Sequence, residues 1–169
     1  MPTAEPIITA KTLPSIVGMR LGNAPYTLVI KYDDGAEMVT DMTGIIHKRQ
    51  ALAALHDQDE FSKVRVINNG DGVAWEAGPD FSADALRHLA EVQRDMTGHD
   101  FKAWMKRLGI SNNEAADVLG VSARTIKAYK ANQGTLPSRV GIACKALERN
   151  LTILHARFRP RKLGRPKND

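Results

Sequence analysis

The chain has 169 residues, 43% of them hydrophobic, with 24 Lys and Arg against 19 Asp and Glu and a formal net charge of +5. No apolar run approaches the roughly 20 residues that cross a bilayer, and the amino terminus lacks a basic segment followed by an apolar one. We therefore expect neither a membrane-spanning helix nor a secretory signal. Cys144 is the single cysteine, which excludes an intrachain disulfide and fits a reducing cytoplasm.

The charge is divided unequally along the chain. Residues 1–93 contain 8 Lys and Arg and 13 Asp and Glu, which gives −5, whereas residues 94–169 contain 16 and 6, which gives +10. An acidic half joined to a basic half indicates two modules with different partners, and the basic module favours a polyanion. Charge alone is equally compatible with a solvated basic surface that binds nothing.

The first half predicts an α+β domain made of two β-hairpins and short helices. β-Branched and aromatic runs indicate the strands, and Asp, Asn and Gly between them indicate the turns. The expected elements are an extended arm or short edge strand over 1–15, strands over 26–32 and 36–42 joined by a turn at 33–35, a short helix over 45–56, and strands over 63–67 and 72–76 joined by a turn at 68–71.

The second half predicts an all-α domain. Ser82 can cap a helix that begins near Ala83, with Leu86, Leu89 and Val92 on one side. Two further apolar stripes at helical spacing indicate buried helix faces. They are Phe101, Trp104, Met105 and Leu108, and Val140, Ile142, Ala143 and Leu147. Cys144 lies in the later stripe and is expected to be a small buried residue. We divide the chain into an acidic α+β domain over 1–82, a connecting helix over 83–98, a helical domain over 99–155 and a basic disordered arm over 156–169.

Residues 111–131 predict two short helices joined by a tight turn. Ser111 and Glu114 have the spacing of a capping box before a helix over 112–119. Gly120 permits the positive φ of a sharp bend, and Ser122 can cap a second helix, Ala123–Ala131. Small residues allow close approach of the helices, and aliphatic and aromatic residues form the seam between them. These residues are Ala115, Ala116, Leu119, Val121, Ile126 and Tyr129.

The remaining positions of the second helix are small, polar or basic, which fits a major groove, because arginine can bond guanine in a bidentate manner and small residues permit close approach. Residues 108–126 resemble the lambda repressor-like (Xre-type) helix-turn-helix family and the DNA-binding domains of some bacterial antitoxins, with a match over about 99–150. The resemblance implies that Ala123, Arg124, Lys127 and Ala128 face base edges and that Ser122, Thr125 and Lys130 lie near the DNA backbone. Asn112 stands where family members often carry glutamine, so a shorter side chain would make that phosphate contact.

The carboxyl-terminal tail adds a second basic signal. Its cations are Arg157, Arg159, Arg161, Lys162, Arg165 and Lys167. Such a segment cannot pack and is expected to stay disordered until it meets phosphates. Residues 164–167 are similar to the core of an AT-hook, but Leu163 stands where that motif has arginine, so a nonspecific phosphate-binding arm is the favoured interpretation.

The residues of the amino-terminal half indicate no particular chemical activity. Residues 15–87, with the turn at 33–35 and the segments 73–75 and 78–81, resemble a small bacterial family of unknown function that occurs alone, fused to helix-turn-helix domains, or near toxin–antitoxin-like genes. An acidic domain beside a DNA-binding domain can serve in dimerisation, partner binding or sensing.

Nothing in the sequence predicts catalysis, a cofactor or a metal site. No histidines are spaced three or four apart, and no phosphate-cradling loop, nucleophile elbow or catalytic triad appears. Asp95 and His99 share a helical face beside Asp100, but helix capping or surface pairing is the favoured interpretation.

We therefore expect a non-enzymatic, sequence-specific DNA-binding protein, either a transcriptional regulator or an antitoxin-like repressor. It is expected to bind double-stranded DNA as a homodimer, because a single recognition helix contacts too few base pairs. The alternative is a protein-interaction module that no longer reads DNA and whose amino-terminal domain binds a partner such as a toxin. RNA binding through the tail lacks the aromatic platform expected for single strands.

Overall fold

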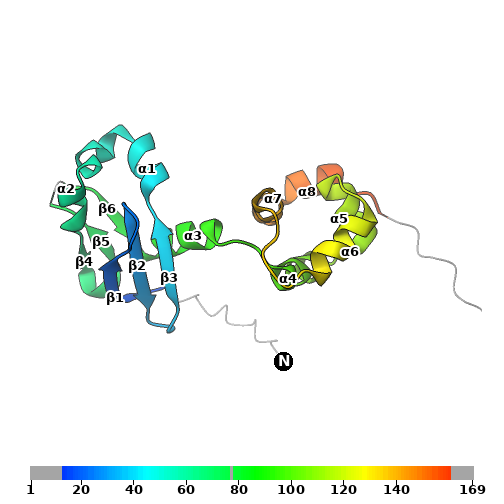
Figure 1. Ribbon diagram of the computed structural model, residues 1–169, viewed down its shortest axis with the longest axis horizontal. Helices are drawn as coiled ribbons and strands as arrows, with labels where there is room; N and C mark the ends of the chain where they lie inside the picture. Colours follow the sequence, from blue (N-terminus) through cyan, green and yellow to red (C-terminus); the bar gives the residue numbers. More distant parts are fainter. Residues whose placement is uncertain (1–12, 77, 161–169) are drawn as a thin grey trace, which may run out of the picture. The chain divides into compact units, whose positions relative to one another are not determined.

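The computed structural model describes residues 13–76 and 78–160. The chain forms two compact units, with the boundary between Gln93 and Arg94 (Figure 1). Unit 1 contains two β-sheets and short helices, and unit 2 is helical in its described part apart from an isolated β-bridge between Thr97 and Thr135. This arrangement confirms the predicted fold class of an α+β part followed by an all-helical part.

The first sheet of unit 1 is antiparallel in the order β1-β2-β3. Its strands are β1 Ile16–Leu21, β2 Thr27–Tyr32 and β3 Glu37–Asp41. The central strand β2 buries Leu28, Ile30 and Tyr32 completely, as its apolar composition requires. The β2–β3 hairpin was predicted. β1 was not predicted: it begins at Ile16, directly after the extended arm or short edge strand expected over 1–15. Residues 1–12 of that arm lie outside the described residues.

Three short helical segments follow the first sheet. They are α1 Thr43–Lys48, the 3₁₀ helix η1 Gln50–His56 and α2 Gln58–Ser62. The single helix expected over 45–56 is therefore wrong in detail, because Arg49 adopts an extended conformation with φ −111° and ψ 116° and separates α1 from η1. Leu52 and Leu55 still face the core, as the apolar spacing predicted.

The second sheet is also antiparallel, in the order β4-β5-β6. Its strands are β4 Arg65–Ile67, β5 Gly72–Ala74 and β6 Asp80–Ser82, and the 3₁₀ turn η2 Asn68–Gly70 joins the first two. Asn68, Asn69 and Gly70 all have positive φ, which confirms the predicted Asn- and Gly-rich turn. Strand β6 was not predicted; its three residues pair with β5, with Phe81 opposite Val73.

Helix α3, Ala83–Gln93, packs against the first sheet and belongs to unit 1. The Thr40 hydroxyl donates to the Leu86 carbonyl at 3.4 Å, and the Gln93 side chain bonds both backbone groups of Asp41. The connecting helix expected over 83–98 thus ends at Gln93 and is part of a core. Val92 is 44% exposed, contrary to prediction, because six residues from Leu86 turn about 240° around a helix.

Unit 2 consists of five helices in its described part. They are α4 Gly98–Leu108, α5 Asn112–Leu119, α6 Ala123–Ala131, α7 Ser138–Arg149 and α8 Leu151–Arg157. Phe101 and Trp104 form the centre of the core, and the Trp104 indole N–H donates to the Cys144 carbonyl at 3.0 Å. The buried face of α4 matches the predicted stripe.

Two expectations for the later helices need correction. Ile142 is 64% exposed, because the buried face of α7 runs through Val140, Cys144 and Leu147 instead. The start of the arm expected to be disordered over 156–169 is helical instead, since α8 continues to Arg157, held by buried Leu154, and residues 161–169 lie outside the described residues.

Helix α4 closely approaches the carboxyl end of α6 at Gly98. A β-carbon at this position would lie 2.1 Å from the Asn132 carbonyl oxygen and 2.6 Å from that of Tyr129. Thr97 caps α4, with its hydroxyl accepting from the Asp100 N–H and the Asp100 carboxylate accepting from the Thr97 N–H. The amino end of α4 therefore fixes the carboxyl end of α6.

Candidate nucleic-acid interface

Helix α5 begins at a complete capping box, as predicted. The Ser111 hydroxyl accepts from the Glu114 N–H at 3.3 Å, and the Glu114 carboxylate accepts from the Ser111 N–H at 2.8 Å. These bonds satisfy two backbone donors that the first helical turn leaves without intrahelical partners. They fix the point at which the chain leaves α4 and enters α5.

We expect Ser111→Ala to lower the free energy of unfolding of unit 2 by about 1 kcal/mol, the usual cost of losing an N-cap side chain. Urea denaturation measures the change. Ser138→Ala is the matched control, because Ser138 is an exposed first residue of α7, whose N-cap makes no side-chain bond. Equal stability of the two variants would contradict a stabilising role for the Ser111 cap.

The turn between α5 and α6 depends on Gly120. Its φ of 68° and ψ of 33° lie in the left-handed region, where glycine carries no steric cost. The Val121 N–H closes the turn on the Ala116 carbonyl at 3.0 Å, and the Ser122 hydroxyl caps α6 by accepting from the Thr125 N–H at 3.0 Å. The predicted glycine bend and the predicted cap of α6 are both confirmed.

The seam between the two helices contains the predicted residues. Ala115 and Ile126 are completely buried and Ala116 is 6% exposed. Leu119, Val121 and Tyr129 are partly buried against the same core, and the Tyr129 ring meets Phe101 edge-on at 5.7 Å. One side of α6 is thereby held against α4 and α5.

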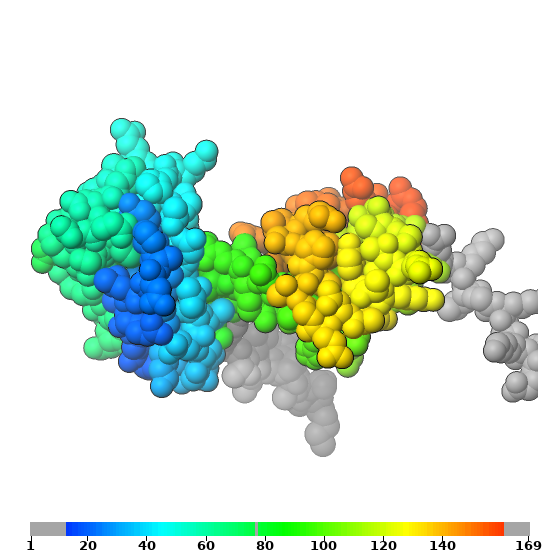
Figure 2. All heavy atoms as spheres, in the orientation of Figure 1, coloured from blue at the N-terminus to red at the C-terminus, as the bar shows by residue number. Residues whose placement is uncertain are grey.

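The opposite side of α6 carries an exposed stripe of Arg124, Lys127, Ala128 and Ala131. Neither Arg124 nor Lys127 takes part in a hydrogen bond or ion pair within the described part of the chain. Figure 2 shows this region of the chain, in yellow, at the surface of unit 2. The exposed stripe of α6 is thus small, cationic and accessible.

The other predicted contact residues of α6 occupy its flanks. Ala123 is half-buried and packs against the core, which differs from the base-facing position expected for it. The hydroxyls of Ser122 and Thr125 are 2.8 Å apart and take part in the helix cap. Half-buried Lys130 donates from Nζ to the Asn112 Oδ1 at 2.9 Å, so two residues predicted near the DNA backbone lie together.

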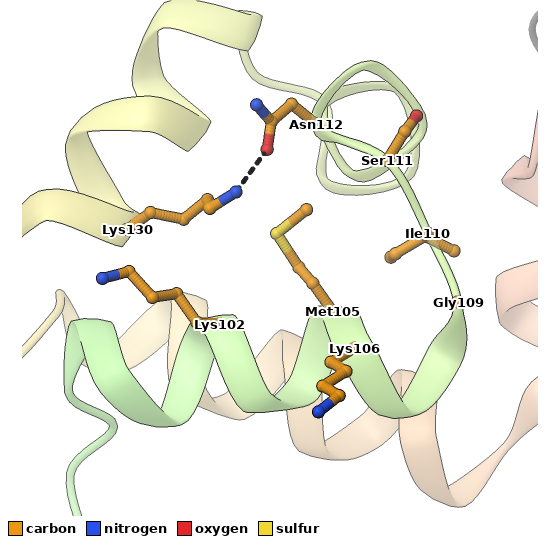
Figure 3. A pocket seen from close by; sticks show the side chains of 8 residues that line it. All are labelled: Lys102, Met105, Lys106, Gly109, Ile110, Ser111, Asn112 and Lys130. Atoms are coloured by element: carbon orange, nitrogen blue, oxygen red, sulfur yellow. Dashed lines mark hydrogen bonds between the residues drawn. The ribbon is translucent and has the colours of Figure 1, made fainter.

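Beside this hydrogen bond is a surface hollow of about 640 Å³ between α4, the start of α5 and the end of α6 (Figure 3). Its lining is apolar at Met105 and Ile110 and cationic at three lysines. The lining residues are Lys102, Met105, Lys106, Gly109, Ile110, Ser111, Asn112 and Lys130. Lys102 and Lys106 were not predicted as site residues, although their spacing of four residues on the polar side of α4 places them on one face.

The basic tail is described only at its start. Arg157 and Arg159 are exposed at the end of α8, and the Arg159 guanidinium donates to the carbonyls of Ala156 and Phe158. The remaining predicted tail contacts lie outside the described residues. They are Arg161, Lys162, Arg165 and Lys167.

The acidic residues near His99 have a structural role. Burial raises the pKa of Asp100, but hydrogen bonds from Thr97 and Arg94 outweigh this effect and hold the pKa below its ordinary value. Among residues 13–76 and 78–160, no group of three or more His, Cys, Asp or Glu side chains gathers in a way that could hold a metal ion. The helices of this same part of the chain include none long and apolar enough to cross a bilayer.

Residues 23–91 match the model of a family described as protein of unknown function (DUF2442). The matched residues lie within unit 1. This match agrees with the expected resemblance of the amino-terminal half to a family without assigned chemistry, whereas no helix-turn-helix family model matches the chain. No curated protein matches either.

Two solved structures are similar to this chain. "Putative DNA Binding Protein NE0471" from Nitrosomonas europaea ATCC 19718 is 26% identical, with a TM-score of 0.46 over 90% of this chain and 97% of that one. A protein of unknown function from Rhodospirillum rubrum ATCC 11170 is 18% identical, with a TM-score of 0.37 over 46% of this chain and 88% of that one. At TM-scores below 0.5, neither similarity establishes a shared fold.

Proposed function

We propose that unit 2 binds double-stranded DNA by docking the exposed stripe of α6 into the major groove. The observation that carries the proposal is the position of Arg124 and Lys127 on a helix whose other side is anchored by Ile126 and Tyr129. A rigid cationic helix with small residues beside its cations can approach base edges closely. Thus the chain acts as a non-catalytic regulator or antitoxin-like repressor.

The protein is proposed to bind the duplex as a homodimer. A helix of nine residues reads only a few base pairs, and two copies on adjacent half-sites reach the specificity that a genome requires. Unit 1 then serves in dimerisation, partner binding or sensing. Light scattering of the free and DNA-bound protein tests the stoichiometry.

The experiment that tests DNA binding is fluorescence anisotropy of a random-sequence duplex, titrated with the full chain at 50 to 200 mM salt. With about six phosphates engaged, affinity is expected to fall roughly a thousandfold across this range. Affinity for single-stranded RNA above that for the duplex would contradict the proposal, as would the absence of duplex binding at the lowest salt.

Removal of residues 161–169 tests the contribution of the tail to DNA binding separately from that of α6. The truncation removes Arg161, Lys162, Arg165 and Lys167 and leaves α8 intact. We expect weaker binding to every duplex and a shallower salt dependence, with the preference between selected and random sequences unchanged, because phosphate contacts carry no sequence information. Loss of that preference on truncation would assign sequence reading to the tail.

A further inference from the structure

The hollow beside α6 contains a concentration of positive charge that the exposed stripe does not explain. Lys102 and Lys106 lie one turn apart on α4, and Lys130 enters the same hollow from the end of α6 (Figure 3). No carboxylate is among the residues that line the hollow. Three lysines therefore border the hollow without a lining acid to neutralise them, and the Lys106 side chain points away from Lys130 and Asn112 (Figure 3).

Two other cations of unit 2 are neutralised within the fold. Arg107, adjacent to Lys106, binds Glu148 with both ends of its guanidinium at 2.6 and 3.0 Å, and Arg94 pairs with Asp100 at 3.1 Å. Neither Lys102 nor Lys106 forms an ion pair within residues 94–160. Lys102 and Lys106 are therefore available to an external anion, as Arg124 and Lys127 of the exposed stripe are.

The hollow adjoins the exposed stripe of α6. Lys127 in the stripe and Lys130 in the hollow are three residues apart, which makes them neighbours on the helix surface. A duplex with its major groove over the stripe has sugar–phosphate backbones along the groove edges. One of those backbones then passes the mouth of the hollow.

The Lys130–Asn112 hydrogen bond orients polar groups that could bind the phosphates of such a backbone. Asn112 accepts from Lys130 through Oδ1, which leaves its two amide N–H groups as donors, and the Lys130 ammonium retains further donors. The Glu114 carboxylate already binds the Ser111 N–H at the amino end of α5. The attraction of an anion to this end of α5 therefore depends on the lysines and not on the helix terminus alone.

We infer that Lys102 and Lys106, together with Lys130 and Asn112, form a seat for a single backbone phosphate of the bound duplex. The inference rests on the proposed function and adds two contact residues from α4. Met105 and Ile110 form the apolar floor, which shields the charges from solvent on one side. Because the lysines share one phosphate, their effects on binding are not additive.

The test compares Lys102→Gln/Lys106→Gln with the wild type by duplex anisotropy across salt. Glutamine keeps helix propensity similar and removes both charges. We expect the salt slope to fall by about 0.9, the value for one phosphate, and the affinity at 0.1 M salt to fall roughly tenfold. Each single variant is expected to produce more than half of this loss. Lys102→Arg/Lys106→Arg should retain the wild-type slope.

Lys48→Gln/Arg49→Gln is the matched control, because it removes the same charge from exposed positions of unit 1. Its salt slope is expected to equal that of the wild type. An unchanged slope in the Lys102/Lys106 variant would overturn the seat while leaving DNA binding intact, and a decrease of about two would replace it with two independent phosphate contacts. Failure of the wild type to bind any duplex would instead refute the proposed function.

Inorganic phosphate distinguishes a DNA phosphate from a free one. Lys102 and Lys106 are both exposed, so a small anion in the hollow exchanges with water easily. We expect phosphate to compete with the duplex no better than chloride at equal ionic strength. Selective competition by phosphate that disappears in the double glutamine variant would show a site for the free anion and overturn the assignment to the DNA backbone.

Discussion

Replacement of both Arg124 and Lys127 by alanine is expected to abolish most of the preference for a selected binding sequence. The two side chains are the cations of the exposed stripe of α6, and a good bidentate contact to a base contributes about 1–3 kcal/mol of discrimination. A combined loss of about 3 kcal/mol corresponds to roughly a hundredfold decrease in the ratio of selected to random affinity.

The measurement requires a binding sequence, which selection of bound fragments from genomic DNA supplies. Affinity for the selected and the random duplex is then compared at one salt concentration for each variant. Arg139→Ala combined with Arg149→Ala is a charge-matched control on α7, a helix that carries none of the residues of the exposed stripe. Retention of full sequence preference in the Arg124/Lys127 variant would remove α6 from base recognition.

Gly98→Ala is expected to give the largest loss of stability among the substitutions considered. The added methyl would meet two backbone carbonyl oxygens, 2.1 Å from Asn132 and 2.6 Å from Tyr129. Backbone cannot rotate away as a flexible side chain does, so α4 and α6 must separate. Overpacking of this kind costs about 1–3 kcal/mol, and a backbone clash belongs at about 3 kcal/mol.

The two tryptophans allow unit 2 to be followed alone. Trp75 lies in unit 1 and Trp104 in unit 2, so in a Trp75→Phe background fluorescence reports the unfolding of unit 2. Gly134→Ala is the control, because its β-carbon would meet only the Asn132 side-chain oxygen at an ordinary 3.5 Å. A midpoint for Gly98→Ala equal to that of the control would show that α4 and α6 adapt to the added methyl.

Sequence reasoning succeeded where a local rule determines the conformation. The Ser111–Glu114 box, the positive φ of Gly120 and the turn at residues 68–70 each follow from the chemistry of at most four consecutive residues. The β-branched and aromatic composition of β2 identified a strand, and the spacing of apolar residues in α4 identified its buried face correctly. These features depend on contacts within a few residues of the chain.

Sequence reasoning was less successful where contacts between residues far apart in the chain determine the conformation. The three-residue strand β6 exists only because β5 is beside it, and its short sequence carries no alternating pattern. α3 has the composition of a connector, yet Gln93 returns to bond Asp41 across 52 residues. The same limit applies to the hollow, since Lys102 and Lys130 become neighbours only when α4 and α6 pack together.

The burial of Cys144 makes the native thiol of the chain unreactive. Burial raises the pKa of this thiol to about 12, so the reactive thiolate is scarce at neutral pH. A second thiol introduced by Ala131→Cys at the surface would therefore react with alkylating probes far faster than the native one. Such a handle on α6 could be joined to a modified base, which would trap the register of the helix along a duplex without removal of the natural cysteine.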